Sequence, residues 1–169
     1  LIPVSGLSVS SSSPTRLTDP TEFAASALGS EVAYAWAFGD GAVGSGETIS
    51  HTYAMAKDFV ASVVASNRLG SVESSIVVSV TNAVPIAVPT VALGHPLAGE
   101  VVVLDGSSSI EPDAHFPLQF KWTQVSGPPV ELADPSQVRT SFVAPNERTK
   151  LKFSLVVTDA FGSTSAPAV

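Results

Sequence analysis

An internal repeat constrains the fold of this chain more than any other feature of its sequence. Two stretches about 90 residues apart each place a tryptophan, Trp36 or Trp122, before a run of alternating apolar and small or polar residues, at residues 59–67 and 151–159. This alternation is typical of a half-buried β-strand. Both runs end in Asn/Asp-x-x-Gly, which favours a turn into a following strand. The sequence therefore predicts two similar all-β units.

Shorter alternating segments fit the same frame, at residues 22–27, 75–80, 101–104 and 119–124. Glycine, proline, serine and aspartate separate them, which is typical of antiparallel β-sandwiches. No window of a dozen residues has the spacing of apolar residues that marks a helix, so almost no helix is expected. Residues 81–85 lack alternation and contain Pro85, which predicts a boundary between domains 1–82 and 83–169.

The two tryptophans are predicted to fill the centres of the two units. Trp36 shares strand parity with Tyr34 and Phe38, so the three side chains point to the same face of one strand. Core packing is the favoured role for such an indole, and ligand stacking is the alternative. In the following turn Asp40 lies between two glycines, where its carboxylate can accept hydrogen bonds from backbone N–H groups or from His51. We interpret Asp40 and His51 as residues that lock this turn.

The first half resembles a PKD (polycystic kidney disease) domain over about residues 4–82. The resemblance rests on the W-x-F-G-D-G run that begins at Trp36, the His-Thr-Tyr run that begins at His51 and the alternating strand that ends at Asn67. The second half, about residues 85–169, resembles the divergent PKD-like branch, in which W-T-Q-x-S-G-P at Trp122 replaces the first run. The resemblance implies two tandem immunoglobulin-like antiparallel β-sandwiches that are extracellular and non-catalytic.

The outward face of the first domain is more apolar than the resemblance implies. Alternation directs Ala33, Ala35 and Ala37 away from the core, together with Val60 and Val64 of the later strand. Relatives usually carry threonine or charged residues there. Either the chain is simply rich in alanine and valine, or a neighbouring module or subunit covers this face, since contiguous exposed apolar patches usually mark contacts.

Charge and hydropathy argue against two classes of partner. The net charge is −7, and the 8 lysine and arginine residues are scattered singly, so no basic stripe is available to bind nucleic acid. No apolar run approaches the ~20 residues of a membrane-spanning helix. The lack of cysteine fits a reducing cytosol as well as a bacterial surface protein, so it does not decide the compartment.

Motifs for catalysis are missing from the sequence. Residues 39–44 match G-x-G-x-x-G, but no helix is expected after them, so a dinucleotide site would lack its phosphate-binding helix N-terminus. His51, His95 and His115 form no H-x-x-x-H or H-E-x-x-H motif, and G-x-S-x-G does not occur. The chain is therefore predicted not to be an enzyme, and no residue is assigned to catalysis, to a cofactor or to a metal.

The resemblance implies one possible ligand, which is calcium. The segment from Asp105 through Glu111 to Asp113 is similar to a D-G-S-x-S-x-D-P-D-G loop, whose acidic residues bind calcium in some relatives together with an aspartate that matches Asp159. Oxygen ligands on a flexible loop suit this ion. Glu111 replaces an aspartate of the loop, however, and His115 follows it. Turn acids without a bound ion are the alternative.

We predict a non-catalytic structural, spacer or adhesion module of a secreted or cell-surface protein, whose partners are other protein modules or subunits of the same assembly. The alternative is an accessory module of a secreted hydrolase that binds a polysaccharide or a fibrous protein. The chain has only two Trp and two Tyr, and the repeat assigns both Trp to the cores. This weakens the alternative, because carbohydrate recognition favours exposed aromatic side chains.

The last strand of the second domain is expected to be short. If Asn67 is aligned with Asp159, Val169 becomes the counterpart of Val77, about three residues before the last strand of the first domain ends. Backbone groups of the adjoining strand, residues 151–158, would then lack partners. Either the boundary of the chain explains this, or a strand from a neighbour completes the sheet by β-augmentation.

Overall fold

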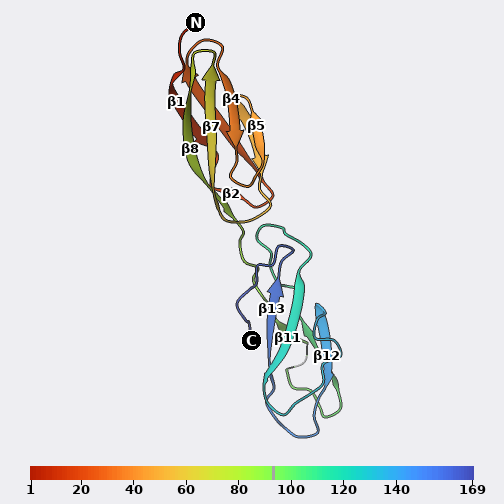
Figure 1. The fold of residues 1–169 in the computed structure, drawn as a ribbon. Coiled ribbons are helices and arrows are strands. Elements are labelled where there is room, and N and C mark those ends of the chain that lie inside the picture. The colour runs from red at the N-terminus through yellow and green to blue at the C-terminus, as the bar shows by residue number, and fades with distance from the viewer. Residues whose placement is uncertain (93) are drawn as a thin grey trace. The chain divides into compact units, whose positions relative to one another are not determined.

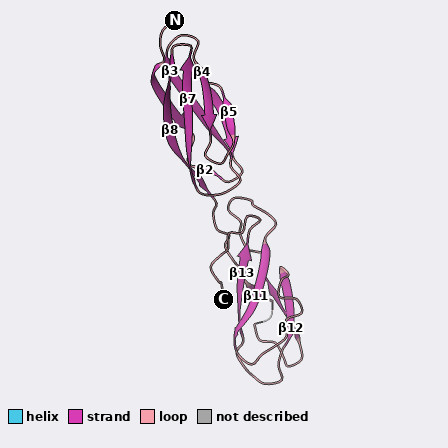
Figure 2. Ribbon diagram, viewed as in Figure 1, coloured by secondary structure: helices cyan, strands magenta, loops and turns pink. Residues whose placement is uncertain are grey.

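The computed structural model describes residues 1–92 and 94–169, which form two compact units, Leu1–Asn82 and Ala83–Val169. Among these residues every regular element is a β-strand, which confirms the predicted all-β fold (Figures 1 and 2). The strands of the first unit are β1 (Ser5–Ser11), β2 (Thr15–Arg16), β3 (Pro20–Leu28), β4 (Ala33–Ala37), β5 (Val43–Ser45), β6 (Thr48–Thr52), β7 (Asp58–Asn67) and β8 (Gly70–Thr81). The strands of the second unit are β9 (Thr90–Val91), β10 (Val101–Asp105), β11 (Gln119–Ser126), β12 (Arg139–Val143) and β13 (Lys152–Thr158).

The first domain is a sandwich of two sheets. One sheet has the order β1-β3-β6, and the other has the order β2-β8-β7-β4-β5. All pairs are antiparallel except β2 with β8, which run parallel over two residues. Strands β7 and β8 form a long hairpin, in which Asn67 pairs with Gly70 at the turn that the repeat predicted.

Alternate residues of β3, β4 and β7 fill the interior of the first domain. Trp36 is 2% exposed, and its ring centroid lies 5.3 Å from that of Phe23 on the opposite sheet. Phe38 stacks nearly parallel to Trp36 at 6.4 Å. Small residues of β7 leave room for these rings, because Ala61 and Ala65 are fully buried beside them in the same core. The predicted inward face of the Trp36 strand is therefore confirmed.

The second domain repeats this plan with smaller sheets, of order β12-β10-β9 and β11-β13. Trp122 on β11 is 3% exposed and packs in a core that includes Leu104, Leu155 and Val157. At the end of β10 the chain must approach this core closely. A Cβ atom on Gly106 would lie 2.8 Å from the Cδ2 atom of Leu155, so a larger residue there would force the buried Leu155 side chain to shift.

The two tryptophans make equivalent hydrogen bonds. The indole Nε1 of Trp36 donates to the carbonyl oxygen of Gly46 at 2.9 Å, and that of Trp122 donates to the carbonyl oxygen of Gln137 at 3.1 Å. Both acceptors lie where the chain crosses from one sheet of its domain to the other, between β5 and β6 or between β11 and β12. The prediction that both indoles occupy cores is confirmed.

The prediction that the outer edge of β13 lacks partners is wrong for its C-terminal part. Leu155 exchanges two backbone hydrogen bonds with Ala168, of 2.8 and 3.0 Å. The N–H of Ser165 donates to the carbonyl oxygen of Val157 at 2.9 Å, and the hydroxyl of Ser165 accepts the N–H of Val157. Pro167 prevents a regular ladder here, because it has no N–H to donate, so the last residues pair through isolated bridges.

Replacing Trp36 with alanine should lower the free energy of unfolding of the first domain by about 3–5 kcal/mol, because it removes a buried indole and leaves a large cavity. Urea titration followed by circular dichroism measures this change. A matched control is Val60→Ala on the neighbouring strand, where the side chain is 59% exposed and the expected change is within about 0.5 kcal/mol. An unchanged urea midpoint for Trp36→Ala would contradict the placement of this residue in the core.

Candidate metal centre and exposed sheet face

The W-x-F-G-D-G run forms the tight turn between β4 and β5. Gly39 has a φ of 84°, and a Cβ atom at this position would lie 2.5 Å from the carbonyl oxygen of Val60, so both the conformation and the space require glycine. One carboxylate oxygen of Asp40 accepts the N–H of Ala42 at 3.0 Å, and the other lies 2.6 Å from Nε2 of His51. The interpretation of Asp40 and His51 as a turn lock is confirmed.

The His-Thr-Tyr run supports this turn from β6. The His51 ring stacks on Phe38 with centroids 4.2 Å apart, and the hydroxyl of Tyr53 donates to the carbonyl oxygen of Phe38 at 3.0 Å. Burial, with a further contribution from the negative charge of Asp40, raises the pKa of Tyr53 to about 12. These polar groups are all engaged in holding the turn, so the cluster is structural.

Opposing effects set the pKa of Asp40. Partial burial acts to raise the pKa, but the hydrogen bonds from His51 and from the N–H of Ala42 outweigh it and bring the pKa below its ordinary value of 3.8. A carboxyl whose pKa is lowered by folding stabilises the folded state at neutral pH. This stabilisation is lost as the pH falls through the lowered pKa of the folded state.

Asp40→Asn should therefore reduce the stability of the first domain at neutral pH by about 1–2 kcal/mol, because charge-assisted hydrogen bonds are lost. The difference from the original chain should shrink as the pH falls below 3.8, where the original carboxyl also becomes protonated. Urea titrations at neutral and strongly acidic pH measure both effects. Asp19→Asn, at an exposed aspartate of the same domain, is the control. A difference that does not change with pH would contradict the ionic role of Asp40.

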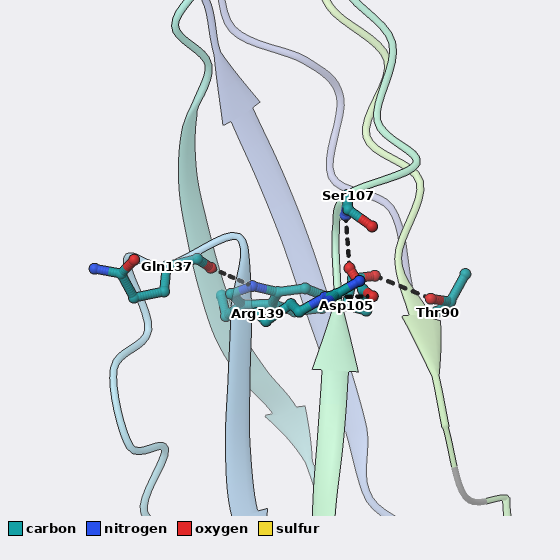
Figure 3. Close-up of polar contacts among 6 residues, drawn as sticks. Thr90, Asp105, Ser107, Gln137 and Arg139 are labelled. Atoms are coloured by element: carbon teal, nitrogen blue, oxygen red, sulfur yellow. Dashed lines mark hydrogen bonds and ion pairs between the residues drawn. The ribbon is translucent and has the colours of Figure 1, made fainter.

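The four acidic residues of the predicted calcium site do not all come together in the second domain. Asp105 ends β10, where one carboxylate oxygen accepts the N–H of Ser107 at 2.8 Å and the other lies 2.8 Å from Nε of Arg139 (Figure 3). Hydrogen bonds from the hydroxyl and N–H of Ser107, together with Arg139, lower the pKa of Asp105. The Asp105 carboxylate therefore holds the start of the loop against β12.

Asp113 fixes the other side of the same loop. Its Oδ2 atom accepts the N–H of Ala83 at 2.6 Å, and its own N–H donates to Oε1 of Glu111 at 3.0 Å. Asp113 therefore ties the loop to the segment with which the second domain begins. Like Asp105, it is not a member of the metal-ligand cluster described next.

A histidine joins the two remaining acids. Glu111, His115 and Asp159 each place one ligand atom within 4.8 Å of the others, and all three side chains are buried. Sequence reasoning noted that His115 follows the acidic loop but did not count it among the ligands. Its position four residues after Glu111 was the available signal, but only the chain path through Ala114, whose φ is 60°, turns the two toward the same place.

Calcium does not suit this donor set. Calcium takes 6–8 oxygen ligands, whereas the cluster offers two carboxylates and an imidazole nitrogen. Asp105, a further acid of the predicted loop, is occupied by Arg139 and Ser107. Calcium binding thus stays a prediction without support from the arrangement of these side chains.

The outward face of the five-stranded sheet in the first domain forms the second candidate site. Val60 and Val77 lie directly opposite each other on β7 and β8 and are 59% and 61% exposed. Val43 on β5 is 77% exposed and pairs with Ala37, which is also exposed. The predicted outward set is confirmed as Ala33, Ala35, Ala37, Val60 and Val64. Sequence reasoning missed Val43 and Val77, because strand register decides which residues join this face.

Two antiparallel sandwiches, each built around a buried tryptophan, make this chain a tandem of immunoglobulin-like domains. The PKD domain model matches residues 6–80, and the model of the K319L-like PKD domain matches residues 96–169. The chain therefore belongs to the PKD family, with a second, divergent domain. PKD domains are typically extracellular structural or adhesion modules and are generally non-catalytic.

Solved structures with similar architecture share little sequence with this chain. Murine CEACAM1b is 11% identical over 95% of both chains, with a TM-score of 0.38. Titin domains z1z2, solved in complex with telethonin, are 14% identical over 93% of this chain and 92% of theirs, with a TM-score of 0.45. SGBP-B of the Bacteroides ovatus mixed-linkage glucan utilization locus, solved with a mixed-linkage heptasaccharide, is 14% identical, with a TM-score of 0.36. The match covers 94% of this chain but only 45% of SGBP-B.

Among curated proteins, none matches this sequence significantly. None of the described residues belongs to a helix that could span a lipid bilayer.

Proposed function

We propose that this chain is a non-catalytic module of a secreted or cell-surface protein. It acts as a spacer or structural subunit and contacts other modules of the same assembly. Its membership of the PKD family supports the extracellular, structural part of this proposal. The exposed face of the five-stranded sheet supports the contact with other modules, because this face has the composition of a surface that is covered in use.

The composition of the face favours a protein partner. Covering one exposed valine removes apolar surface from water and contributes about 1 kcal/mol or more. The outward positions around the valines are mostly small, so little charge must lose its hydration on contact. These positions are Ala33, Ala35, Ala37, Ser45, Ser62, Ser66, Ser75 and Ser79. Glu73, which pairs with Val64, and Asp58, the first residue of β7, are the charged residues at outward positions of β4, β7 and β8.

Lysines in place of Val60 and Val77 should prevent this contact, because they put two like charges opposite each other in the centre of the face. The simplest partner module is a second copy of the chain. Sedimentation velocity over rising concentration should then show self-association of the original chain and a monomeric double variant. Leu28→Lys is the control, since Leu28 is 70% exposed but lies on β3 of the other sheet.

Two outcomes would contradict the proposed contact face. The original chain could stay monomeric at every concentration, or Leu28→Lys could abolish association as completely as the double variant. Circular dichroism of each variant establishes that its fold is unchanged.

The alternative function, binding of a polysaccharide or a fibrous protein as part of a secreted hydrolase, has weaker support. Both tryptophans are buried, so they offer no stacking platform. Phe116 and Phe161 of the second domain are 62% and 47% exposed and are the remaining aromatic candidates. Strong binding on a glycan array that is lost in Phe116→Ala or Phe161→Ala would support this alternative function instead.

A further inference from the structure

The second domain buries a carboxylate oxygen for which its fold supplies no hydrogen bond. Glu111 is 8% exposed, and its Oε2 atom has no hydrogen-bond partner, while Oε1 accepts the N–H of Asp113. A buried charged oxygen without a partner is costly, and proteins compensate such charges with cations or hydrogen bonds. The same carboxylate belongs to the cluster with His115 and Asp159. A cation held by the cluster would supply the missing partner.

The other two side chains of the cluster are also buried and fixed in place. His115 is 7% exposed and Asp159 is 2% exposed. One oxygen of Asp159 accepts the N–H groups of Phe161 and Ser163, both at 2.8 Å, which orients the carboxylate. The Phe161 ring packs edge-on against the His115 ring at 4.8 Å. Hydrogen bonds and packing of this kind orient ligand side chains around metals in proteins.

The cluster connects two separate parts of the chain. Glu111 and His115 lie in the loop between β10 and β11, whereas Asp159 directly follows β13. The N–H of Ala160 donates to the carbonyl oxygen of His115 at 3.1 Å, so the two segments already touch through the backbone. An ion bound by all three side chains would join the loop to the end of β13.

The type of donor atoms indicates the class of ion. An imidazole nitrogen with two carboxylates is a ligand set for borderline divalent metals such as Zn²⁺, whereas Ca²⁺ and Mg²⁺ prefer oxygen alone. We propose that Glu111, His115 and Asp159 bind a divalent transition-metal ion, with Zn²⁺ as the best-suited ion, and that this ion clamps the β10–β11 loop to β13. The ligand atoms must approach somewhat from their spread of up to 4.8 Å, because zinc ligands lie about 2.0–2.2 Å from the metal.

Titration calorimetry of the chelator-treated, full 169-residue chain with Zn²⁺ and with Ca²⁺ tests this assignment. Zinc should bind with a stoichiometry of one and raise the melting temperature of the second domain by mass action on the folded state. Calcium at the same concentration should leave the melting temperature unchanged. A failure to bind zinc, or a stabilisation by calcium as large as that by zinc, would overturn the proposal.

His115→Gln should weaken zinc binding by about 10- to 100-fold or more, since loss of an outer-shell partner alone has that effect. His95→Gln, at an exposed histidine of the same domain, is the control and should bind zinc unchanged. His51→Gln tests the other histidine that has a carboxylate partner, Asp40 of the first domain. Zinc binding that survives His115→Gln and disappears in His51→Gln would overturn the assignment.

The Glu111→Gln variant distinguishes a role of Glu111 as a metal ligand from a purely structural role. Without metal this variant should melt no lower than the original chain, because it removes a buried charge whose Oε2 has no partner. It should nevertheless lose most of the stabilisation by zinc. If His115→Gln does not fold, X-ray absorption of the original zinc-loaded chain still decides the question. The spectrum should show one imidazole among oxygen ligands, and a zinc shell without imidazole would refute the site.

Discussion

The hydrogen bond from a buried tryptophan to the carbonyl oxygen of a loop determines how each sandwich closes. Trp36 reaches Gly46 and Trp122 reaches Gln137, and each acceptor lies where the chain leaves one sheet and enters the other. An indole inside an apolar core must place its N–H on an acceptor. The side chain that fills the core thereby also fixes the crossover between the sheets. The rest of each domain is arranged around this constraint.

Each indole fills the core of its domain and has a hydrogen-bond acceptor for its N–H. Features outside the cores can therefore differ between the two domains. In the first domain the turn after Trp36 is locked by Asp40 and His51, and the outward sheet face carries small and apolar side chains. In the second domain Asp105 is tied to Arg139 on the neighbouring strand. The first domain therefore offers a surface for contact, while the second offers a buried polar cluster.

Much of this architecture could be predicted from the sequence, because alternation and turn residues act locally. The alternating run at residues 59–67 became β7, and both tryptophans lie in the cores as their strand parity required. Strands β1 and β12 were not among the predicted strands, since serine, threonine and arginine weaken their alternation and they become strands mainly by pairing with β3 and β10. Their formation depends on partners that local sequence does not reveal.

The candidate metal cluster was predicted only in part, again for a physical reason. Loop similarity connected Glu111 with Asp159, but it also included Asp105 and Asp113, whose partners come from β12 and from Ala83. His115 enters the cluster through the left-handed turn at Ala114, a conformation that is uncommon for alanine, although the loop pattern carries glycine at this position. Side-chain clusters formed by loops depend on such backbone turns far more than on residue type.

Hydrogen exchange of the two indole N–H groups, followed by nuclear magnetic resonance, tests the central role of the tryptophans most directly. If each indole hydrogen bond fixes the closure of its sandwich, each N–H should exchange only when its own domain unfolds globally. Its exchange rate should then match that of the slowest backbone amides in β7 or β13. Rapid exchange of either indole, while those backbone amides remain protected, would show that the sandwich closes without this bond and would contradict the account.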